Sequence, residues 1–430
     1  MSNGRDVVIV EGVRTPFAKA GTKLKEVHAA DLGKAALTEL VAMTNLDVNL
    51  VDEVIIGNTG TPSDAVNISR VVALKSGFPM KTSAYTVHRN CASAMESITN
   101  GFEKIKSGTM DTIVAGGTES MSNMPLLFSK GMTDVFAKLM SAKSVGAKLS
   151  ALSEIKLKYL APRIAIVEGL TDPFCGLNMG QTAEVLAKKF EISREEQDAF
   201  ALKSHQKAVA AKDKLQEEIT PVFLPPSYKS SLAEDIGPRA EQSLEALAKM
   251  RPYFDRKFGT VTVANACPIT DGAAMLLLMS REKAEAEGYK PIAKIRSYGF
   301  AGCDPKEMGL GPVYASPLAL KRAGLTMKDM GLVELNEAFA AQVIACQKAF
   351  ASDVFAEREL GLSQAVGEID PAILNVNGGA IALGHPVGAT GSRLVLTLVK
   401  EMQRRNVEFG LATLCIGGGQ GGAMVVEREG

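Results

Sequence analysis

Residues 83–105, SAYTVHRNCASAMESITNGFEKI, predict a strand, a sharp turn and a helix in immediate succession. The first five residues include aromatic and β-branched side chains, and the segment after Cys91 has a helical composition. A thiol at the start of a helix faces unpaired N–H groups and the positive end of the helix dipole, which favour thiolate over thiol. Cys91 is therefore a candidate nucleophile, although most cysteines are small buried hydrophobes.

A second stretch, AILNVNGGAIALGHPVGATGSRLVLTLVKEM at 372–402, repeats the order strand, special turn, helix. Each stretch is followed by a glycine-rich strand end, TIVAGGTES or LATLCIGGGQGG. The repetition predicts two similar halves whose corresponding turns meet near a pseudo-twofold axis. The second turn carries His385 and the second strand end carries Cys415, so both join Cys91 as candidates for a shared site. We expect the other histidines, at 28, 88 and 205, to be structural or exposed.

The composition argues against several classes of protein. A chain of 430 residues with 46% hydrophobic content can bury two or three substantial cores. Its 48 basic and 48 acidic residues give no overall field to attract a polyanion, so no nucleic-acid partner is expected. Six scattered cysteines without a CxxC pair predict neither a disulfide scaffold nor a metal site, and indicate a reducing, cytoplasmic location. The start lacks a leader pattern and no long apolar run occurs, so neither export nor a membrane span is expected.

Strand-like and helix-like segments alternate along most of the chain, which predicts an α/β fold with a mainly parallel sheet. The alternation stops at 121–256, which we expect to form an inserted, mainly helical loop domain. Ser193-Arg-Glu-Glu196 predicts a capping box at the start of one of its helices. The expected organisation is a first half from residues 1–120 plus 257–285, this insertion, and a second half from 286–430.

The glycine run after Cys415 also contains the pattern G-x-G-x-x-G, at Gly417, Gly419 and Gly422. In dinucleotide-binding proteins this pattern opens a helix. Here the following residues, AMVVE, are strand-like. A dinucleotide site is therefore not expected.

Over essentially its whole length the sequence resembles the thiolase family. The motifs that carry the resemblance are RTPF at 14–17, CAS at 91–93, AGGTESMS at 115–122, MGQTAE at 179–184, GTVT…DGAA at 259–274, NEAFA at 336–340, GHPVGATGSR at 384–393 and CIGGGQGG at 415–422. The resemblance implies a duplicated five-layer α-β-α-β-α core and acyltransferase activity. It is greatest to the 3-ketoacyl-CoA thiolases, which implies thiolytic cleavage of 3-ketoacyl-CoA by CoA in fatty-acid β-oxidation.

The resemblance also implies a role for each site residue. Cys91 attacks the keto carbon, with His385 holding it ionised, and an acyl-cysteine results. Cys415 protonates the departing acetyl-CoA carbanion and later deprotonates incoming CoA. One oxyanion site comes from His385 with a water held by Asn336, and another from the N–H groups of Cys91 and Gly417. Coenzyme A is a co-substrate, and neither a permanent cofactor nor a metal is expected.

The expected coenzyme A contacts are Arg239, Met179 and Cys267. Arg239 matches an arginine that the family uses near the adenine end, and Cys267 stands where many members have a serine that touches the pantetheine. Cysteine is the poorer hydrogen-bonding group. Asn178 stands before Met179 where short-chain biosynthetic members have histidine. These departures favour a degradative 3-ketoacyl-CoA thiolase over a dedicated acetoacetyl-CoA enzyme.

The segment 125–170 resembles the extended loop of thiolase subunits in β-oxidation multienzyme complexes. Its apolar residues at helical spacing form one face of a predicted basic helix within 130–165, and they are Met132, Val135, Phe136, Leu139 and Met140. Such a helix packs on its own domain, docks a hydratase/dehydrogenase subunit, or contacts a membrane peripherally.

Two other functions stay open at the level of sequence. One is a short-chain acetyl-CoA C-acetyltransferase that makes or cleaves acetoacetyl-CoA, because both directions use the same groups. The other is a lipid-binding relative without catalysis, which would be expected to lack Cys91, His385 or Cys415; all three are present. The family implies a homodimer or a dimer of dimers. Chain-length preference and physiological direction do not follow from the sequence.

Overall fold

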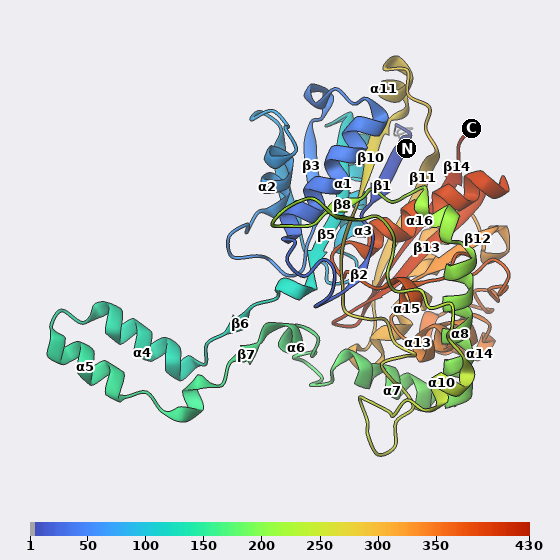
Figure 1. Cartoon of the computed structure of the whole chain (residues 1–430). Helices are drawn as coiled ribbons and strands as arrows, with labels where there is room; N and C mark the ends of the chain where they lie inside the picture. The colour runs from blue at the N-terminus through green and yellow to red at the C-terminus, as the bar shows by residue number, and fades with distance from the viewer. Residues whose placement is uncertain (1–4) are drawn as a thin grey trace.

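The computed structural model describes residues 5–430, so residues 1–4 of the predicted first half lie outside the described residues. Figure 1 shows a large α/β body from which one helical arm projects. The strands of the body are β1 Val7–Arg14, β2 Ala18–Lys19, β3 Glu53–Gly57, β4 Ser83–Val87, β5 Thr112–Ser120, β10 Thr270–Ser280, β11 Ala293–Gly302, β12 Leu332–Leu335, β13 Phe409–Ile416 and β14 Gln420–Arg428. The body's helices include α1 Ala29–Thr44, α2 Ile68–Lys75, α3 Ser93–Lys106, α11 Arg281–Ala286, α12 Gly311–Ala323, α13 Ala340–Phe350, α14 Asp353–Phe355, α15 Ala380–Leu383 and α16 Thr390–Arg405.

The strands form a ten-stranded sheet within residues 5–430, in the order β12-β13-β14-β11-β1-β10-β5-β3-β4, with β2 on β10. In the first half, β4, β3 and β5 are parallel, and β10 and β1 then continue antiparallel. In the second half, Leu374 bridges Val333 of β12 in parallel, β13 follows in parallel, and β14 and β11 continue antiparallel. The two halves therefore repeat one pattern of strand directions.

The prediction of a mainly parallel sheet was wrong, because most of the paired strands run antiparallel. The reason is clearest at β13 and β14, which only three residues, 417–419, connect. A parallel pair needs a crossover of a dozen or more residues, so a connection this short forces a hairpin.

The helices and the two halves of the sheet form five layers, with helices on the outer face of each half and between the two halves. The outer helices α1 and α2 pack on the first half around Leu32, Leu37 and Val72, and α12 and α13 pack on the second half. Helices α3 and α16 lie together in the centre, where Met95 and Leu396 belong to one buried cluster with strands of both halves. This is the α-β-α-β-α order that the family resemblance implied.

Local signals explain several helix ends. His28 accepts a hydrogen bond from the Ala30 N–H at the start of α1, which gives this histidine a structural role, as expected. Ser193 and Glu196 form the predicted capping box at the start of helix α8, Arg194–Ala210. The insertion contains α6 Ala165–Gly169, α7 Met179–Lys189, α8 Arg194–Ala210, α9 Lys212–Gln216, α10 Leu244–Ala248 and the short strands β8 Val222–Phe223 and β9 Ser231–Leu232.

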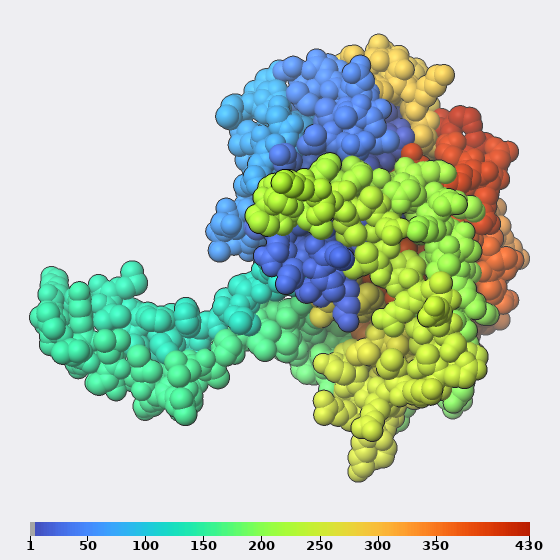
Figure 2. Space-filling model, in the orientation of Figure 1, coloured from blue at the N-terminus to red at the C-terminus, as the bar shows by residue number. Residues whose placement is uncertain are grey.

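The arm, residues 126–164, leaves the body through the two-stranded ribbon of β6 (Leu126–Leu127) and β7 (Arg163–Ile164). Figure 2 shows its surface standing clear of the rest of the molecule in that view. The prediction of one helix within 130–165 was wrong, because the segment folds as α4 (Lys130–Ser141) and α5 (Val145–Ser153) with a 3-10 turn at Leu157–Leu160.

Only part of the apolar face predicted in the arm is buried. Met132 and Val135 are buried, whereas Phe136 is 38% and Met140 is 89% exposed. α4 and α5 are separate helices because the side chain of Ser144 accepts a hydrogen bond from the Ala147 N–H and so caps the start of a new helix. Since α4 packs on α5 and the adjoining turn, the arm folds on itself and leaves apolar side chains at its surface.

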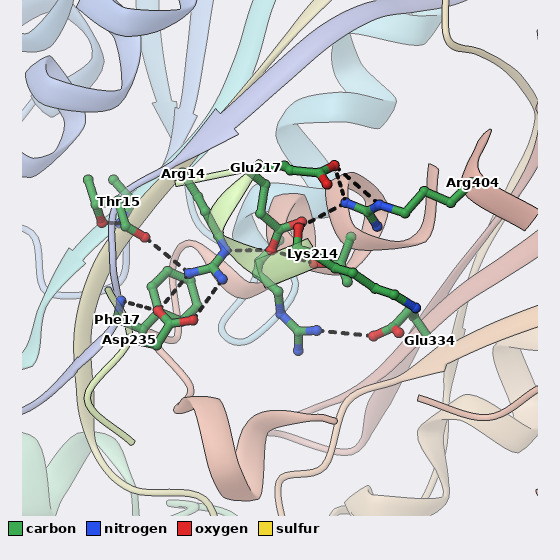
Figure 3. Close-up of polar contacts among 12 residues, drawn as sticks. Arg14, Thr15, Phe17, Lys214, Glu217, Asp235, Glu334 and Arg404 are labelled. Atoms are coloured by element: carbon green, nitrogen blue, oxygen red, sulfur yellow. Dashed lines mark hydrogen bonds and ion pairs between the residues drawn. The ribbon is translucent and has the colours of Figure 1, made fainter. Parts of the chain in front are cut away.

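A buried ionic network joins the insertion to the body (Figure 3). Arg14, fully buried in β1, donates from Nε to Glu218 at 2.6 Å and from Nη1 to Asp235 at 2.7 Å. Asp235 also accepts the N–H of Phe17, and Glu218 accepts the hydroxyl of Thr397 in α16. Removing one partner would leave an uncompensated buried charge, so this network fixes the insertion against both halves.

Among residues 5–430, no helix combines the length and apolarity needed to cross a bilayer.

Candidate active site

Cys91 lies between the end of β4 and the start of α3, in the turn that the sequence predicted. Asn90 adopts the left-handed conformation with φ of 44°, and its side-chain amide donates to the carbonyl of Gly417 at 2.7 Å. The N–H of Gly417 in turn donates to the Cys91 thiol. The glycine turn after β13 is therefore held against the cysteine, so Cys91 and Gly417 come together as predicted.

The protonation of Cys91 differs from the sequence-based expectation. Burial raises the pKa of the thiol above its ordinary value, while hydrogen bonds from the N–H groups of Gly417 and of Cys91 itself lower it only in part, and the carboxylate of Glu119 adds to the rise. The loss of hydration on burial thus raises the pKa of Cys91 more than the N–H groups at the start of the helix lower it. Without substrate Cys91 carries its proton, and it needs a base to become a nucleophile.

His385 lies in the turn 384–391 and is positioned by two contacts. Its N–H donates to Thr270 Oγ1 at 3.1 Å, and its Nδ1 lies 2.6 Å from Thr390 Oγ1. The Thr390 hydroxyl uses its one hydrogen on the carbonyl of Pro386, at 3.0 Å, so its oxygen accepts the hydrogen on Nδ1. The imidazole is then the tautomer with a free lone pair on Nε2.

The Nε2 atom of His385 is buried and has no hydrogen-bond partner among the described residues. Burial, with the nearby charge of Arg393, lowers the pKa of this histidine to about 3. The ring is therefore neutral at physiological pH. A neutral imidazole with a free Nε2 is a proton acceptor, the base that the protonated Cys91 requires.

Close packing brings the histidine turn to the cysteine segment. A Cβ on Gly391 would lie 2.3 Å from the backbone N of Met95, and a Cβ on Gly117 would lie 2.0 Å from the carbonyl oxygen of Gly388 and 2.7 Å from Cβ of Ala94. The turn 384–391 thus lies on the first turn of α3, directly after Cys91. The glycines are needed because the two halves meet here backbone to backbone.

Cys415 is the penultimate residue of β13 and is 1% exposed. Burial raises its pKa well above the ordinary value, and Cys91, Cys346 and Cys267 nearby raise it further. Cys267 lies in the same group, because burial and then Cys91 raise its pKa to about 12. Both are protonated thiols near Cys91. Cys415 is thus suited to donate a proton.

Asn336 follows β12 and is held through its backbone N–H, which donates to the Thr413 carbonyl at 2.9 Å. Its side chain is fully buried, yet neither amide atom has a hydrogen-bond partner within residues 5–430. Unsatisfied buried amides are rare in folded proteins and call for a partner such as water or ligand. This amide can therefore hold a water or a substrate oxygen.

A cavity of about 950 Å³ opens at Cys91. Of the predicted site residues, Cys91, Met179 and Gly417 line it, and the sulfur of Met179 would lie 3.4 Å from a Cβ on Gly417. Other lining residues come from the base of the arm and are largely apolar, including Met121, Met124, Pro125 and Ile166. An extended apolar group on the Cys91 sulfur would fit here.

The structure does not bring Arg239 to this cavity wall. Its side chain is exposed, and its backbone N–H donates to Nδ1 of the buried His205 at 3.2 Å. Burial and the charge of Arg239 lower the pKa of His205 to about 4, so this histidine is a neutral structural acceptor, as predicted.

The residues that hold the site in place were not predicted from the sequence. Thr390 and Thr270 position His385, and Glu119 accepts a hydrogen bond from Gly388 in the same turn. Thr390 and Glu119 stand inside motifs quoted above, five residues after His385 and within AGGTESMS. Thr390 had a further signal in its closeness to His385 along the chain, whereas the contact of Glu119 with Gly388 depends on tertiary packing.

Comparisons with known proteins agree with this geometry. The thiolase N-terminal domain model matches residues 7–282, and the thiolase C-terminal domain model matches residues 289–428. The chain is 43% identical over 429 residues to a 3-ketoacyl-CoA thiolase of Yersinia pestis (strain Pestoides F), covering 99% of this chain and 98% of the relative. The chain belongs to the thiolase family, a family of acyltransferases, so the predictions of family and enzyme class are confirmed.

Solved structures are similar over the full length. Human mitochondrial 3-ketoacyl-CoA thiolase in complex with CoA gives a TM-score of 0.84 at 38% identity, covering 99% of this chain and 98% of that one. The acetyl-CoA acetyltransferase of Bacillus anthracis gives a TM-score of 0.86 at 36% identity, covering 99% of both chains. The predicted fold class is thereby confirmed.

Proposed function

We propose that this protein cleaves 3-ketoacyl-CoA with CoA, giving acetyl-CoA and a shortened acyl-CoA through an acyl-cysteine at Cys91. One observation carries the proposal: a neutral histidine with a free, buried Nε2 lies in a turn packed directly on the segment of a protonated cysteine. The two groups form an uncharged nucleophile–base pair, suited to acyl transfer without a metal ion.

In the first half of the proposed reaction, His385 Nε2 takes the proton of Cys91, and the sulfur attacks the keto carbon. The N–H groups of Cys91 and Gly417 stabilise the oxyanion formed there. The bond between the α and β carbons then breaks, and negative charge moves to the thioester oxygen of acetyl-CoA. Protonated His385 and a water held by Asn336 stabilise that charge, and the unpaired amide of Asn336 supports this role.

Cys415 completes both halves of the proposed reaction as acid and then base. Its thiol protonates the carbon of the departing acetyl-CoA, and the resulting thiolate takes the proton of the incoming CoA. The CoA sulfur then attacks the acyl-cysteine, the shortened acyl-CoA is released, and the Cys91 sulfur takes its proton back from His385. A buried thiol with a raised pKa supports this role, because it holds its proton until a strongly basic carbanion forms beside it.

We also propose contacts with coenzyme A for Met179, Cys267 and Arg239. The position of Met179 against Gly417 in the cavity, and of Cys267 near Cys91, supports a pantetheine path past both sulfurs. Exposed Arg239 is available for the phosphate or adenine end. The solved relative with bound CoA supports a CoA site in this fold.

The apolar cavity beside Cys91 supports acyl chains longer than acetyl. The similarity to an acetyl-CoA acetyltransferase makes the short-chain enzyme the second candidate. Steady-state thiolysis measured on 3-ketoacyl-CoA of four to sixteen carbons, about the range such a cavity can hold, separates the two. The proposal expects kcat/KM to rise beyond four carbons. A maximum at acetoacetyl-CoA would favour the second candidate, and no thiolysis at any length would reject the proposed function.

Finally, we propose a cytoplasmic homodimer that works in fatty-acid β-oxidation. Strand β4 forms one edge of the sheet directly before Cys91, and an open edge suits pairing with a second copy.

The exposed apolar side chains of the arm, such as Met140 and Leu157, support docking to a hydratase/dehydrogenase subunit or peripherally to a lipid surface. Docking by the arm is tested by copurification of a hydratase/dehydrogenase subunit with the full chain and with a variant that lacks residues 130–160. Sedimentation tests whether the protein is a dimer. The domain boundaries given above stay a prediction.

A further inference from the structure

One buried carboxylate, that of Glu119 at the end of β5, accepts hydrogen bonds from five donors. Oε1 accepts from Asn58 Nδ2 at 3.0 Å and from the Gly60 N–H at 2.9 Å. Oε2 accepts from the Thr59 N–H at 3.0 Å, from the Thr59 hydroxyl, and from the Gly388 N–H at 2.9 Å. Four donors belong to the segment 58–60, and the fifth belongs to the turn of His385.

The charge of this carboxylate is held without a cation. Glu119 is 1% exposed, and within residues 5–430 it forms no ion pair with Lys, Arg or His. Burial raises its pKa, and the hydrogen bonds from Thr59, Gly60 and Gly388 act in the opposite direction because they stabilise the ionised form. Since both oxygens meet only donors, a carboxylate satisfies the site and a carboxamide does not.

The fit around Glu119 is also steric. A Cβ on Gly388 would lie 2.6 Å from Glu119 Oε2 and 2.9 Å from Cα of Asn58. A Cβ on Gly60 would lie 2.9 Å from Glu119 Oε1. The histidine turn and the 58–60 segment therefore touch the same carboxylate from two sides, with glycine at each closest approach.

Both segments belong to the site. Thr59, Gly60 and Val387 line the cavity that opens at Cys91, and Val387 lies between His385 and Gly388 in the turn. We propose that Glu119 is a positioning residue, which clamps the histidine turn to the cavity wall and so sets the place of His385 Nε2 relative to the Cys91 thiol. The clamp builds on the proposed function, because it assumes His385 as the base for Cys91.

The electrostatic effect of Glu119 has the opposite sign to its positioning effect. Its negative charge raises the pKa of Cys91 and so opposes thiolate formation. Removing only the charge would therefore make Cys91 more reactive at neutral pH. Displacing His385 would make it less reactive, because the thiol would lose its proton acceptor. The direction of the change in reactivity thus separates the two effects.

The test is the rate at which iodoacetamide alkylates Cys91 at pH 7, followed by mass spectrometry of the Cys91 peptide in the full-length protein. Glu119→Gln is expected to slow alkylation about tenfold, toward the rate of His385→Ala, since a displacement of about 1 Å costs one to two orders of magnitude. Glu53→Gln is the matched control, because Glu53 is also buried in this sheet but is bonded to Ser83 and Lys104. It should leave the rate unchanged.

A rate for Glu119→Gln equal to or above the wild-type rate would overturn the clamp. Should Glu119→Gln not fold, Thr59→Val removes a single donor, and it is expected to slow alkylation two- to threefold, on the order of one lost hydrogen bond; no slowing overturns the clamp in that case. Alkylation needs no CoA substrate. Failure of thiolysis together with the expected alkylation order would therefore reject the proposed function and keep the clamp.

Discussion

His385 Nδ1 lies 2.6 Å from the hydroxyl oxygen of Thr390, whose own hydrogen points to the Pro386 carbonyl. The threonine therefore acts as an acceptor toward the ring and selects the tautomer with a free Nε2. Because Thr390 is the first residue of α16, the helix that packs centrally on α3, the tautomer of the base is tied to the packing of the two halves.

Replacing Thr390 by Val keeps the shape and removes the acceptor for Nδ1–H. We expect kcat for thiolysis to fall about 10- to 100-fold with a small change in KM, as for other groups that orient a histidine. Ser392→Ala in the same helix is the control, since its buried hydroxyl has no partner in the described chain. It should stay within about twofold, and an equal loss in both variants would contradict the role given to Thr390.

The two catalytic cysteines should fail at different steps. Cys91→Ala removes the nucleophile and should abolish the acyl-enzyme, whereas Cys415→Ala should still be acylated by 3-ketoacyl-CoA but turn over poorly. Intact-protein mass spectrometry after a short incubation measures the acylated fraction. Loss of acylation in both variants to the same extent would refute this division of roles.

The glycines after β13 should differ sharply in how well they tolerate substitution by alanine. Gly419 has φ of 77°, and a Cβ there would lie 2.4 Å from the Cys303 carbonyl oxygen and 2.6 Å from the Pro305 nitrogen. A Cβ on Gly417 would lie no closer than 3.4 Å to its nearest neighbour, the Met179 sulfur. In urea unfolding, Gly419→Ala should lose at least about 2 kcal/mol and Gly417→Ala less than about 1 kcal/mol. The reverse order would show that the turn is held differently.

The lowered pKa of Glu401 predicts that part of the stability of the protein is lost in acid. Burial alone would raise the pKa of its carboxyl, but hydrogen bonds from Asn377, Arg405 and Arg404 outweigh burial and lower it to about 2. The unfolded value is about 4.3. A lowered folded pKa stabilises the protein above the unfolded value, and this contribution disappears as the pH falls from about 5 to 2.

Glu401→Gln should therefore cost about 2 to 3 kcal/mol at pH 7, with the difference from wild type shrinking below pH 5. Denaturant unfolding at several pH values measures it. Glu39→Gln on the exposed face of α1 is the control and should leave the free energy of unfolding unchanged. A cost for Glu401→Gln that stayed constant down to acid would show that charge is not its cause.

The sequence predicted the fold wherever the signal was local or carried by a motif. The strand, turn and helix around Cys91, the capping box at Ser193 and the layered duplicate core all appear in the structure. Strand direction was missed, because the partner of a strand is fixed by contacts distant in sequence. The break in the arm was missed because the apolar spacing from Met132 to Met140 covers only α4 and carries no signal for the new helix that begins after Ser144.

The site residues were found through motifs, but their protonation was not. The position of Cys91 before a helix suggested a thiolate, whereas burial reverses the balance, and burial depends on how the two halves close over the turn. Glu119 was missed for the same reason, because its partner Gly388 is distant in sequence and is brought near by packing. Thr390 lies only five residues after His385, but the sequence does not show the direction of its hydroxyl.

The pairing of β1 with β10 joins Val7 to Ser280. While the chain emerges from the ribosome, β1 has to wait for about 270 further residues before its main partner exists, which at ordinary elongation rates takes on the order of tens of seconds. Its apolar run VVIV is exposed during that interval. Production of this protein in cells should therefore depend on chaperones that shelter nascent chains, more strongly than its final stability would suggest.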